Sequence, residues 1–245
     1  MKKAFLNWSS GKDAVYALYL LQEKNEVSVE KLVTSMNSET NRISMHGLRK
    51  ELLVKQAESL GLPLHIISLP GNVSMSVYNE VMQKETDLLK SEGFTHSVFG
   101  DIFLEDLREY REQQLQKAGL QAVFPLWKKD TSEYMQEFLK AGFKAITVSV
   151  NAKMLDASFC GRIIDEAFLC DLPENVDPAG ENGEFHTFVF DGPNFSFPIG
   201  FRRGEIVEKV YESIGNKKED CFTDDQKSWD TRFCYCDLLP TGAPS

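Results

Sequence analysis

The sequence has 245 residues, 42% of them hydrophobic and 26% charged, as expected for a globular protein with one large domain or two small ones. Its 27 basic and 37 acidic residues give a net charge of −10, which argues against a broad nucleic-acid-binding surface. No apolar run is long enough to cross a membrane, and the N-terminus lacks the apolar core of a signal peptide. Together with five cysteines that fit free thiols, these features predict a cytoplasmic protein.

In the first half of the chain, segments typical of strands alternate with segments typical of helices. The expected strands are residues 4–6, 29–36, 64–69, 95–99 and 121–124, and the expected helices are residues 15–21, 46–60, 77–90 and 105–118. This alternation predicts an α/β fold with a doubly wound, parallel five-stranded sheet that helices cover on both faces. A ligand then lies where the strand order reverses, so residues 9–13 and 100–102 flank one crevice.

The loop after the first strand consists of small or charged residues, namely Ser9, Ser10, Gly11, Lys12 and Asp13. A loop that ends a strand and begins a helix presents backbone N–H groups and the positive end of the helix dipole, which favour an anion such as phosphate. Lys12 adds positive charge, whereas a carboxylate at Asp13 fits beside phosphate if a divalent cation lies between them. The alternative is an ordinary helix N-cap with two spare serines.

Two phosphate-binding motifs can be compared with this loop. The P-loop of common nucleotidases is excluded, because Leu6 stands where it needs glycine and Asp13 where it needs Ser or Thr. The pyrophosphate loop, Ser-Gly-Gly-x-Asp-Ser, matches residues 9–14 except at Ser10 and Ala14. Each departure removes either close backbone approach or a hydroxyl group.

From about Trp127 the pattern changes, which predicts a domain that carries the residue 9–14 loop over residues 1–126 and a smaller α+β domain over residues 127–245. We expect helices at residues 131–141 and 160–169, a strand at 145–150, and an antiparallel meander of strands at 185–190, 195–201 and 206–211. Gly-Pro and Arg202-Arg203-Gly204 are expected to form its turns. The polar residues 215–228 are expected to form a mobile surface loop, before a final strand at 231–238.

A short loop before the first of these meander strands gathers acidic residues and a histidine around two glycines. It contains Asp177, Glu181, Glu184 and His186. Carboxylates can hold Mg²⁺, orient an amine or take a proton, and His186 is a candidate base near neutral pH. The alternative is a solvated acidic turn.

These motifs together resemble the diphthine–ammonia ligase family, whose members are N-type ATP pyrophosphatases with an adenine nucleotide alpha-hydrolase-like fold. The resemblance covers residues 1 to about 200. It rests on the residue 9–14 loop, on Pro125-Leu126-Trp127 and on the run Gly180-Glu-Asn-Gly-Glu-Phe-His-Thr187. Shorter matches occur in order at His46, residues 56–58, residues 61–64 and Gly100-Asp101-Ile102.

The resemblance implies that ATP adenylates a carboxylate with release of pyrophosphate, and that ammonia then displaces AMP to leave an amide. In the family, that carboxylate belongs to a modified histidine on translation elongation factor two. By carry-over, Ser9, Ser10, Gly11, Lys12 and Asp13 hold phosphates together with Gly100 and Asp101, and Asp13 binds Mg²⁺. Catalytic roles then fall to Lys12, Asp13, Glu181, Glu184 and His186, and Asn182 and Gly183 form part of the acceptor or ammonia pocket.

Arg108 and Arg111 lie one turn apart on the helix after Asp101, where they can contact phosphate or the acceptor. A surface ion pair with Glu105 or Glu112 is the alternative. We expect free ammonium as the nitrogen source, and the sequence leaves a homodimer open. Two other functions remain: a related pyrophosphatase acting on a different small carboxylate or carbonyl, and a nucleotide-binding sensor without catalysis. The second domain and the acidic loop argue against the sensor.

Overall fold

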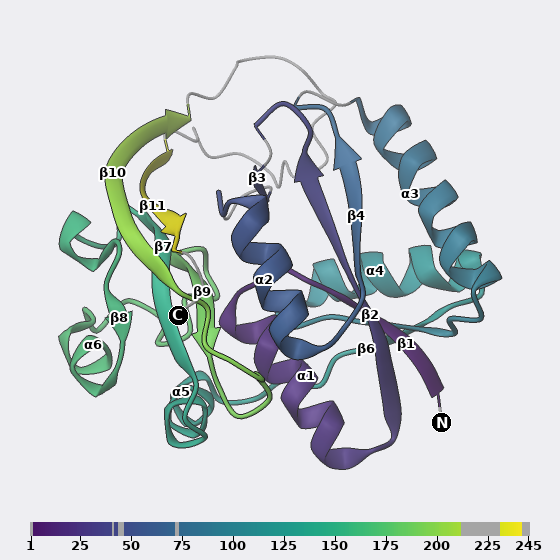
Figure 1. The fold of residues 1–245 in the computed structure, drawn as a ribbon, viewed down its shortest axis with the longest axis horizontal. Helices are drawn as coiled ribbons and strands as arrows, with labels where there is room; N and C mark the ends of the chain where they lie inside the picture. Colours follow the sequence, from purple (N-terminus) through teal and green to yellow (C-terminus); the bar gives the residue numbers. More distant parts are fainter. Residues whose placement is uncertain (1, 41, 44–46, 72–73, 212–230, 242–245) are drawn as a thin grey trace.

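The computed structural model describes residues 2–40, 42–43, 47–71, 74–211 and 231–241. Its first half forms a six-stranded sheet with four helices (Figure 1). Along the chain these elements are β1 (Lys2–Asn7), α1 (Lys12–Lys24), β2 (Val27–Asn37), β3 (Arg42–Ile43), α2 (Lys50–Leu60), β4 (Leu64–Leu69), α3 (Met75–Ser91), β5 (His96–Val98), α4 (Glu105–Ala118) and β6 (Gln121–Val123). The expected helix at residues 46–60 therefore begins later, at Lys50, and His46 lies outside the described residues.

Five strands of this sheet are parallel, in the order β4-β2-β1-β5-β6, and the short β3 pairs antiparallel with the end of β2. Alternate residues of each strand point to opposite faces. Leu6 and Leu32 therefore pack in one buried core with α1 and α2, whereas Phe5 and Val33 pack in another with α3 and α4. The predicted doubly wound parallel sheet is confirmed, and its order reverses between β1 and β5.

The second half forms a five-stranded antiparallel sheet. Its elements are α5 (Thr131–Lys140), β7 (Lys144–Asn151), a 3₁₀ turn (Ala157–Phe159), β8 (Ile163–Ile164), α6 (Glu166–Asp171), β9 (Phe185–Asp191), β10 (Phe201–Tyr211) and β11 (Thr231–Pro240). Strand β7 pairs with β8, β9 and β11, and β10 pairs with β11. The expected meander is therefore wrong, because β9 and β10 follow one another in the chain but do not pair.

Two other expected elements in this half are wrong. Residues 195–200 form no strand, because their backbone bonds to α2 instead: Ser196 N donates to Ser59 O at 2.9 Å, and Phe197 N donates to Ser59 Oγ at 3.1 Å. The expected turn at Arg202-Arg203-Gly204 lies within β10, at a bulge opposite Asp237. Residues 215–228 lie outside the described part of the chain.

The expected helix at residues 160–169 is also interrupted. Gly161 has a φ of 76°, a left-handed conformation that ends helical structure. A true helix begins only at α6, where the Asp165 side chain accepts from Phe168 N at 2.7 Å and caps the first turn.

The two halves share one buried core. Tyr16 of α1 packs its ring against Tyr134 and Phe138 of α5, with ring centroids 5.1 and 6.1 Å apart. At another contact, Arg42 and Arg49 both donate to the Asp237 carboxylate of β11, at 2.6 to 3.0 Å. The domain boundary at residues 126 and 127 stays a prediction.

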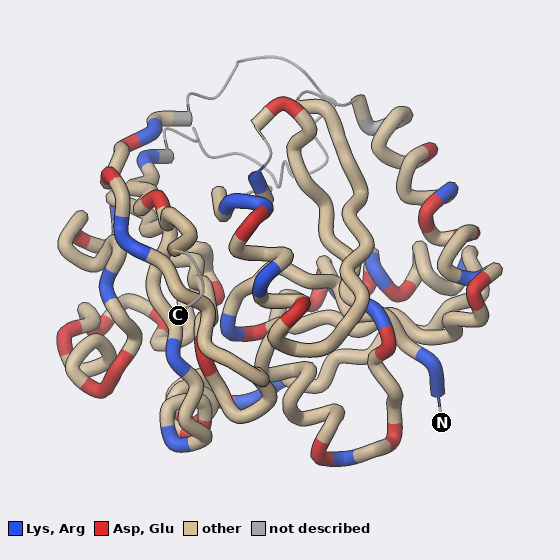
Figure 2. The backbone as a smooth tube through the Cα atoms, in the orientation of Figure 1, with Lys and Arg blue, Asp and Glu red and all other residues tan. Residues whose placement is uncertain are grey.

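In the described chain, Figure 2 shows basic and acidic residues interspersed over both sheets and their helices. No described helix is both long enough and apolar enough to span a membrane.

Candidate active site

The loop between β1 and α1 lies at the carboxyl end of β1, beside the point where the strand order reverses. Gly11 is the N-cap of α1, with extended backbone and no side-chain cap bond. The first turn of the helix is thus left without a side-chain acceptor at its cap, and its N–H groups and dipole suit an anion. Lys12 N donates to Thr187 Oγ1 at 3.0 Å, so β9 of the second half holds this turn.

Ser10 has a φ of 70°, in the left-handed region that favours glycine. This position is glycine in the pyrophosphate-loop motif, so Ser10 keeps the backbone shape of that motif at a steric cost. Its carbonyl accepts from Val189 N and from Gln56 Nε2, each at 3.1 Å. Its hydroxyl is buried and has no hydrogen-bond partner among the described residues. Ser9 lies beside it, and the Ser9 Oγ accepts from Gly11 N at 3.4 Å.

Gln56 of α2 is fully buried beneath this loop, and the sequence did not reveal its role. Its amide nitrogen also donates to Val189 O at 2.7 Å, and its amide oxygen accepts from Trp8 Nε1 at 2.8 Å. The Gln56 side chain thus connects the loop of residues 9–13, which we call the phosphate loop, with Trp8 before it and with Val189 of β9. The sequence signal that could have indicated this role is the position of a polar residue within the apolar stripe of a helix.

The Lys12 side chain is buried and faces three groups. Its Nζ lies 2.6 Å from Asp13 Oδ1 and 3.8 Å from Glu181 Oε1. The Tyr134 hydroxyl donates to the same Asp13 oxygen at 3.1 Å. The acidic loop of the second half therefore meets the phosphate loop, as the resemblance implied, and Tyr134 joins them. Nothing in the sequence distinguished Tyr134 from an ordinary core aromatic residue.

Several carboxyl groups lie close together around Lys12. Burial, followed by the Asp13 charge, raises the pKa of Glu181 to about 8. Burial also raises the pKa of Asp101, where Arg111 opposes the shift and Asp13 adds to it. These carboxyl groups therefore act on one another electrostatically, and a bound cation would relieve their repulsion.

His186 is a weaker base than expected. Burial and the nearby Lys12 charge lower the pKa of its imidazole to about 4, so the ring is neutral at pH 7. The His186 imidazole can therefore accept a proton only from a reacting group whose pKa is lower than its own.

Glu184 is fully buried, and its carboxylate points into its own loop. It accepts from Asp177 N at 3.0 Å, from Asn182 N at 2.8 Å and from Asn182 Nδ2 at 3.1 Å. Gly183 between them has a φ of 82°. Glu184 and Asn182 thus hydrogen-bond within the loop that carries Glu181.

Gly100 and Asp101 follow β5, and Gly100 lies directly against Asp13. Asp101 pairs with Arg111, with Nε and Oδ2 3.1 Å apart, and the Arg111 guanidinium lies 4.2 Å from the Phe99 ring centroid. Arg108 instead donates to Glu112 at 2.7 Å and stacks over Trp127 at 4.5 Å. Of the two arginines, Arg111 joins the crevice and Arg108 forms the alternative ion pair.

A magnesium ion fits this crevice only together with phosphate. The described residues contain no group of three or more His, Cys, Asp or Glu side chains placed to hold a metal. Mg²⁺ commonly takes one or two carboxylates and completes its shell with phosphate oxygens and water. Asp13, with Asp101 close enough to affect its charge, can supply such a partial set.

Comparisons with family models and with curated proteins indicate the same family. Residues 1–122 match the family model of the diphthamide synthase N-terminal domain, and residues 130–238 match that of the C-terminal domain. The chain is 27% identical over 166 residues to the diphthine–ammonia ligase of Bos taurus and 26% identical over 166 residues to that of Homo sapiens. Each alignment covers 62% of this chain and 62% of the relative.

A yeast relative matches a smaller part of its own length. The diphthine–ammonia ligase of Schizosaccharomyces pombe is 26% identical over 133 residues, which is 53% of this chain and 22% of that protein. The chain thus spans about three-fifths of the length of the animal relatives that it matches. The two family models together cover nearly all of the sequence, and this chain belongs to the diphthamide synthase family.

Proposed function

We propose that this chain is an ATP-dependent ligase that adenylates a carboxylate and lets ammonia displace AMP. The observation that carries the proposal is the buried Lys12 at the start of α1, between Asp13 of the phosphate loop and Glu181 of the second half. A phosphate-binding loop alone would suit a sensor. The second half, however, brings titratable groups to the same crevice, as a reaction requires.

The chemistry explains the need for ATP. A carboxylate is a poor electrophile because its leaving group would be oxide. In the first step, a carboxylate oxygen attacks the α-phosphorus of ATP, and the bond to pyrophosphate breaks. In the second, ammonia attacks the carbonyl carbon, the bond to AMP breaks, and one proton is released.

The residues of the crevice then take distinct roles. Lys12 and the N–H groups of the α1 first turn hold the β- and γ-phosphates and stabilise the pyrophosphate as it leaves. Asp13 would hold Mg²⁺, and the ion would neutralise phosphate charge. The neutral imidazole of His186 is the proton acceptor at the acceptor side of the crevice, and Glu181, whose pKa is about 8, accepts a proton only once it is ionised.

The acceptor, by analogy with the names of the relatives, is diphthine. The family resemblance implies that its carboxylate belongs to a modified histidine on translation elongation factor two. Free ammonium supplies the nitrogen. A cytoplasmic location and a homodimer stay predictions. A different small carboxylate is the nearest alternative, and it would leave the roles of these residues unchanged.

The test uses purified protein with ATP, Mg²⁺, ammonium and the modified factor, and it measures AMP and pyrophosphate. We expect both products in equal amounts, only when acceptor and ammonium are present. Asp13→Asn should abolish them and remove the thermal stabilisation by ATP and Mg²⁺. The matched control Asp106→Asn, on the exposed first turn of α4, should behave as the native protein. If ATP stabilises the protein but no AMP forms with any acceptor, the result would favour a nucleotide-binding sensor without catalysis.

A further inference from the structure

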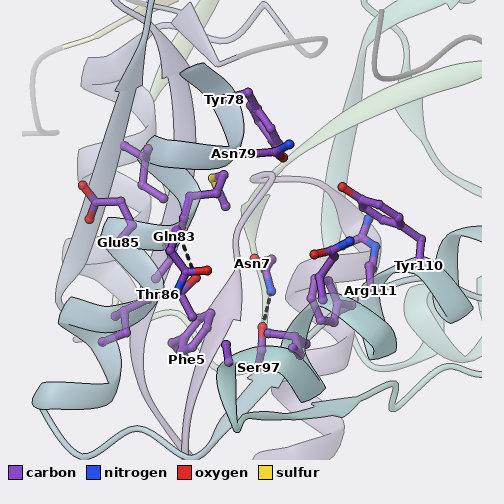
Figure 3. Close-up of a pocket in the computed structure, with 18 of the residues that line it drawn as sticks. Phe5, Asn7, Tyr78, Asn79, Gln83, Glu85, Thr86, Ser97, Tyr110 and Arg111 are labelled. Atoms are coloured by element: carbon purple, nitrogen blue, oxygen red, sulfur yellow. Dashed lines mark hydrogen bonds between the residues drawn. The ribbon is translucent and has the colours of Figure 1, made fainter. Parts of the chain in front are cut away.

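A cavity of about 400 Å³ lies between α3 and α4, on the face of the parallel sheet opposite α1 (Figure 3). Its charged lining residues are Glu85 and Arg111, and the rest of its lining is neutral. Glu85 bonds to His65, and Arg111 pairs with Asp101. The charges in the lining of this cavity are therefore already paired and select no class of ligand.

A second cavity, of about 560 Å³, lies where the two halves of the chain meet. It is lined by Arg42 of β3, by residues 202–205 and Val207 of β10, and by Asp237 and Leu239 of β11. Three of these eight residues are arginines and two are carboxylates. The cavity is thus a basic site on a chain whose net charge is −10.

Two of the three arginines in this cavity carry charge that no carboxylate balances. Arg42, together with Arg49 beside the cavity, donates to the Asp237 carboxylate. Within the described residues, neither Arg202 nor Arg203 forms an ion pair, and both are exposed. The Arg203 Nη1 donates instead to the Gly161 carbonyl at 3.2 Å, which holds this side chain at the cavity. Two positive charges therefore face the cavity without a carboxylate partner there.

The bulge in β10 explains why two neighbouring arginines line the same cavity. Successive residues of a regular strand point to opposite faces. Here the register between β10 and β11 shifts between Arg203 and Ile206, and a bulge of this kind changes the direction of the side chains around it. Gly204 within the bulge lies so close to β11 that a Cβ atom would be 3.1 Å from the Asp237 carbonyl oxygen.

The strand that carries these arginines is also an edge strand. Among the described residues, β10 pairs only with β11. An edge strand presents unpaired N–H and C=O groups, with which an extended segment of another chain can pair. Beside the arginines, Ile206, Val207 and Val210 are 41% to 52% exposed and offer apolar contacts. The open edge therefore suits an extended peptide better than a small ion.

We infer that this cavity and the open edge of β10 dock an extended acidic segment of the protein that carries the acceptor carboxylate. The inference rests on the proposed function, in which the acceptor is part of a protein. Carboxylates of the segment pair with Arg202 and Arg203, because the guanidinium group can hold a carboxylate through two parallel hydrogen bonds. Since the rest of the chain is acidic, it repels such a segment elsewhere, and this contrast directs the partner to the cavity.

The test compares two charge reversals. Arg202→Glu lies in the cavity, whereas Lys117→Glu makes the same change at the exposed end of α4, outside both cavities. With the modified factor as acceptor, AMP release gives KM and kcat at low and at high salt. Arg202→Glu should raise the KM for the factor about tenfold at low salt, less at high salt, and leave kcat unchanged. Lys117→Glu should keep the native values, and circular dichroism checks that both variants fold.

Direct binding of the modified factor, measured by interferometry without ATP, separates docking from catalysis. Weaker binding by Arg202→Glu than by the native protein supports docking, and if no AMP forms in that case, only the proposed function is contradicted. AMP release with the same KM in Arg202→Glu and native protein would overturn docking and leave the proposed function intact. If Arg202→Glu does not fold, Arg202→Gln takes its place with a smaller effect in the same direction.

Three other results would also overturn the docking inference. The first is a native protein that does not bind the factor. The second is equal weakening by Lys117→Glu, which would mean that net charge alone governs binding. The third is binding of inorganic phosphate that Arg202→Glu removes while factor binding stays native, which would make the cavity a site for small anions.

Discussion

Gly100 lies directly against the backbone of Asp13. A Cβ atom on Gly100 would be 2.9 Å from the Asp13 carbonyl carbon and 3.0 Å from the Ala14 nitrogen. Backbone at the start of a helix cannot move aside as a flexible side chain can. Only glycine therefore lets the end of β5 approach α1 this closely, and that approach brings Asp101 beside Asp13.

The first prediction concerns Gly100→Ala. The added methyl group must push the end of β5 away from α1, which should lower the free energy of unfolding by about 1–3 kcal/mol and weaken ATP binding. Urea denaturation and calorimetry measure the two effects. Gly71→Ala is the control, because the atom nearest its new Cβ is the end of the flexible Glu39 side chain. Equal effects of the two substitutions would contradict the contact.

The second prediction concerns Ser10→Gly. Left-handed backbone costs a residue with a side chain roughly 1–2 kcal/mol, whereas glycine loses about 0.4–1 kcal/mol more chain entropy on folding. We therefore expect a net gain of about 0.5–1 kcal/mol in the free energy of unfolding, with ATP binding retained. Asn25→Gly, at a φ of 53°, should gain less because asparagine tolerates this conformation. Destabilisation by Ser10→Gly would mean that the buried hydroxyl has a stabilising partner.

The sequence predicted the first half well because its signals are local. Strand and helix periodicities and the glycine stops at Gly61 and Gly119 are read within a dozen residues, and both glycines end their helices in left-handed conformation. The predictions for the second half failed where contacts between residues distant in the sequence determine the local structure. Residues 195–200 carry the aromatic residues of a strand, but bonds to Ser59 hold them as a loop.

The same distinction applies to the candidate site. The residues of the phosphate loop and the acidic loop could be found because each motif is contiguous. Gln56, Tyr134 and Thr187 owe their roles to contacts with Ser10, Asp13 and Lys12. These partners lie 46, 121 and 175 positions away in the sequence, so no local pattern indicates the contacts. The orientation of Glu184 into its own loop likewise depends on side-chain geometry, which composition does not specify.

The third prediction concerns Gln56→Leu. Leucine keeps the volume but leaves Trp8 Nε1 without its acceptor and Val189 O without one of its donors, so the free energy of unfolding should fall by about 1–3 kcal/mol. Tripolyphosphate binding should weaken as well, because the Ser10 carbonyl loses a donor. Gln116→Leu on the exposed face of α4 is the control. Loss of stability with unchanged tripolyphosphate affinity would restrict Gln56 to a structural role.

The fourth prediction concerns Asp237→Asn. The Arg49 and Arg42 guanidinium groups lower the pKa of Asp237 to about 2, so its stabilising contribution is present above pH 4 and is lost as the pH falls toward 2. We expect the variant to be about 1–2 kcal/mol less stable at pH 7 and equal to the native protein near pH 2. Asp171→Asn removes a more exposed ion pair with Arg162 and should have little effect. A difference between variant and native protein that does not depend on pH would contradict this electrostatic account.

The fifth prediction concerns Glu181→Gln. Burial and Asp13 raise the pKa of Glu181 from 4.5 to about 8, so between these values the folded protein keeps a proton that the unfolded chain has lost. Native stability should therefore fall as the pH rises through this window, by at most about 1.4 kcal/mol per pH unit. Glutamine removes the titration, and the variant should gain stability over the native protein from pH 5 to pH 8. Urea denaturation across this range measures the difference, and Glu109→Gln on exposed α4 controls for charge alone. Parallel stability curves for the native protein and Glu181→Gln would show that Glu181 is already ionised in the fold.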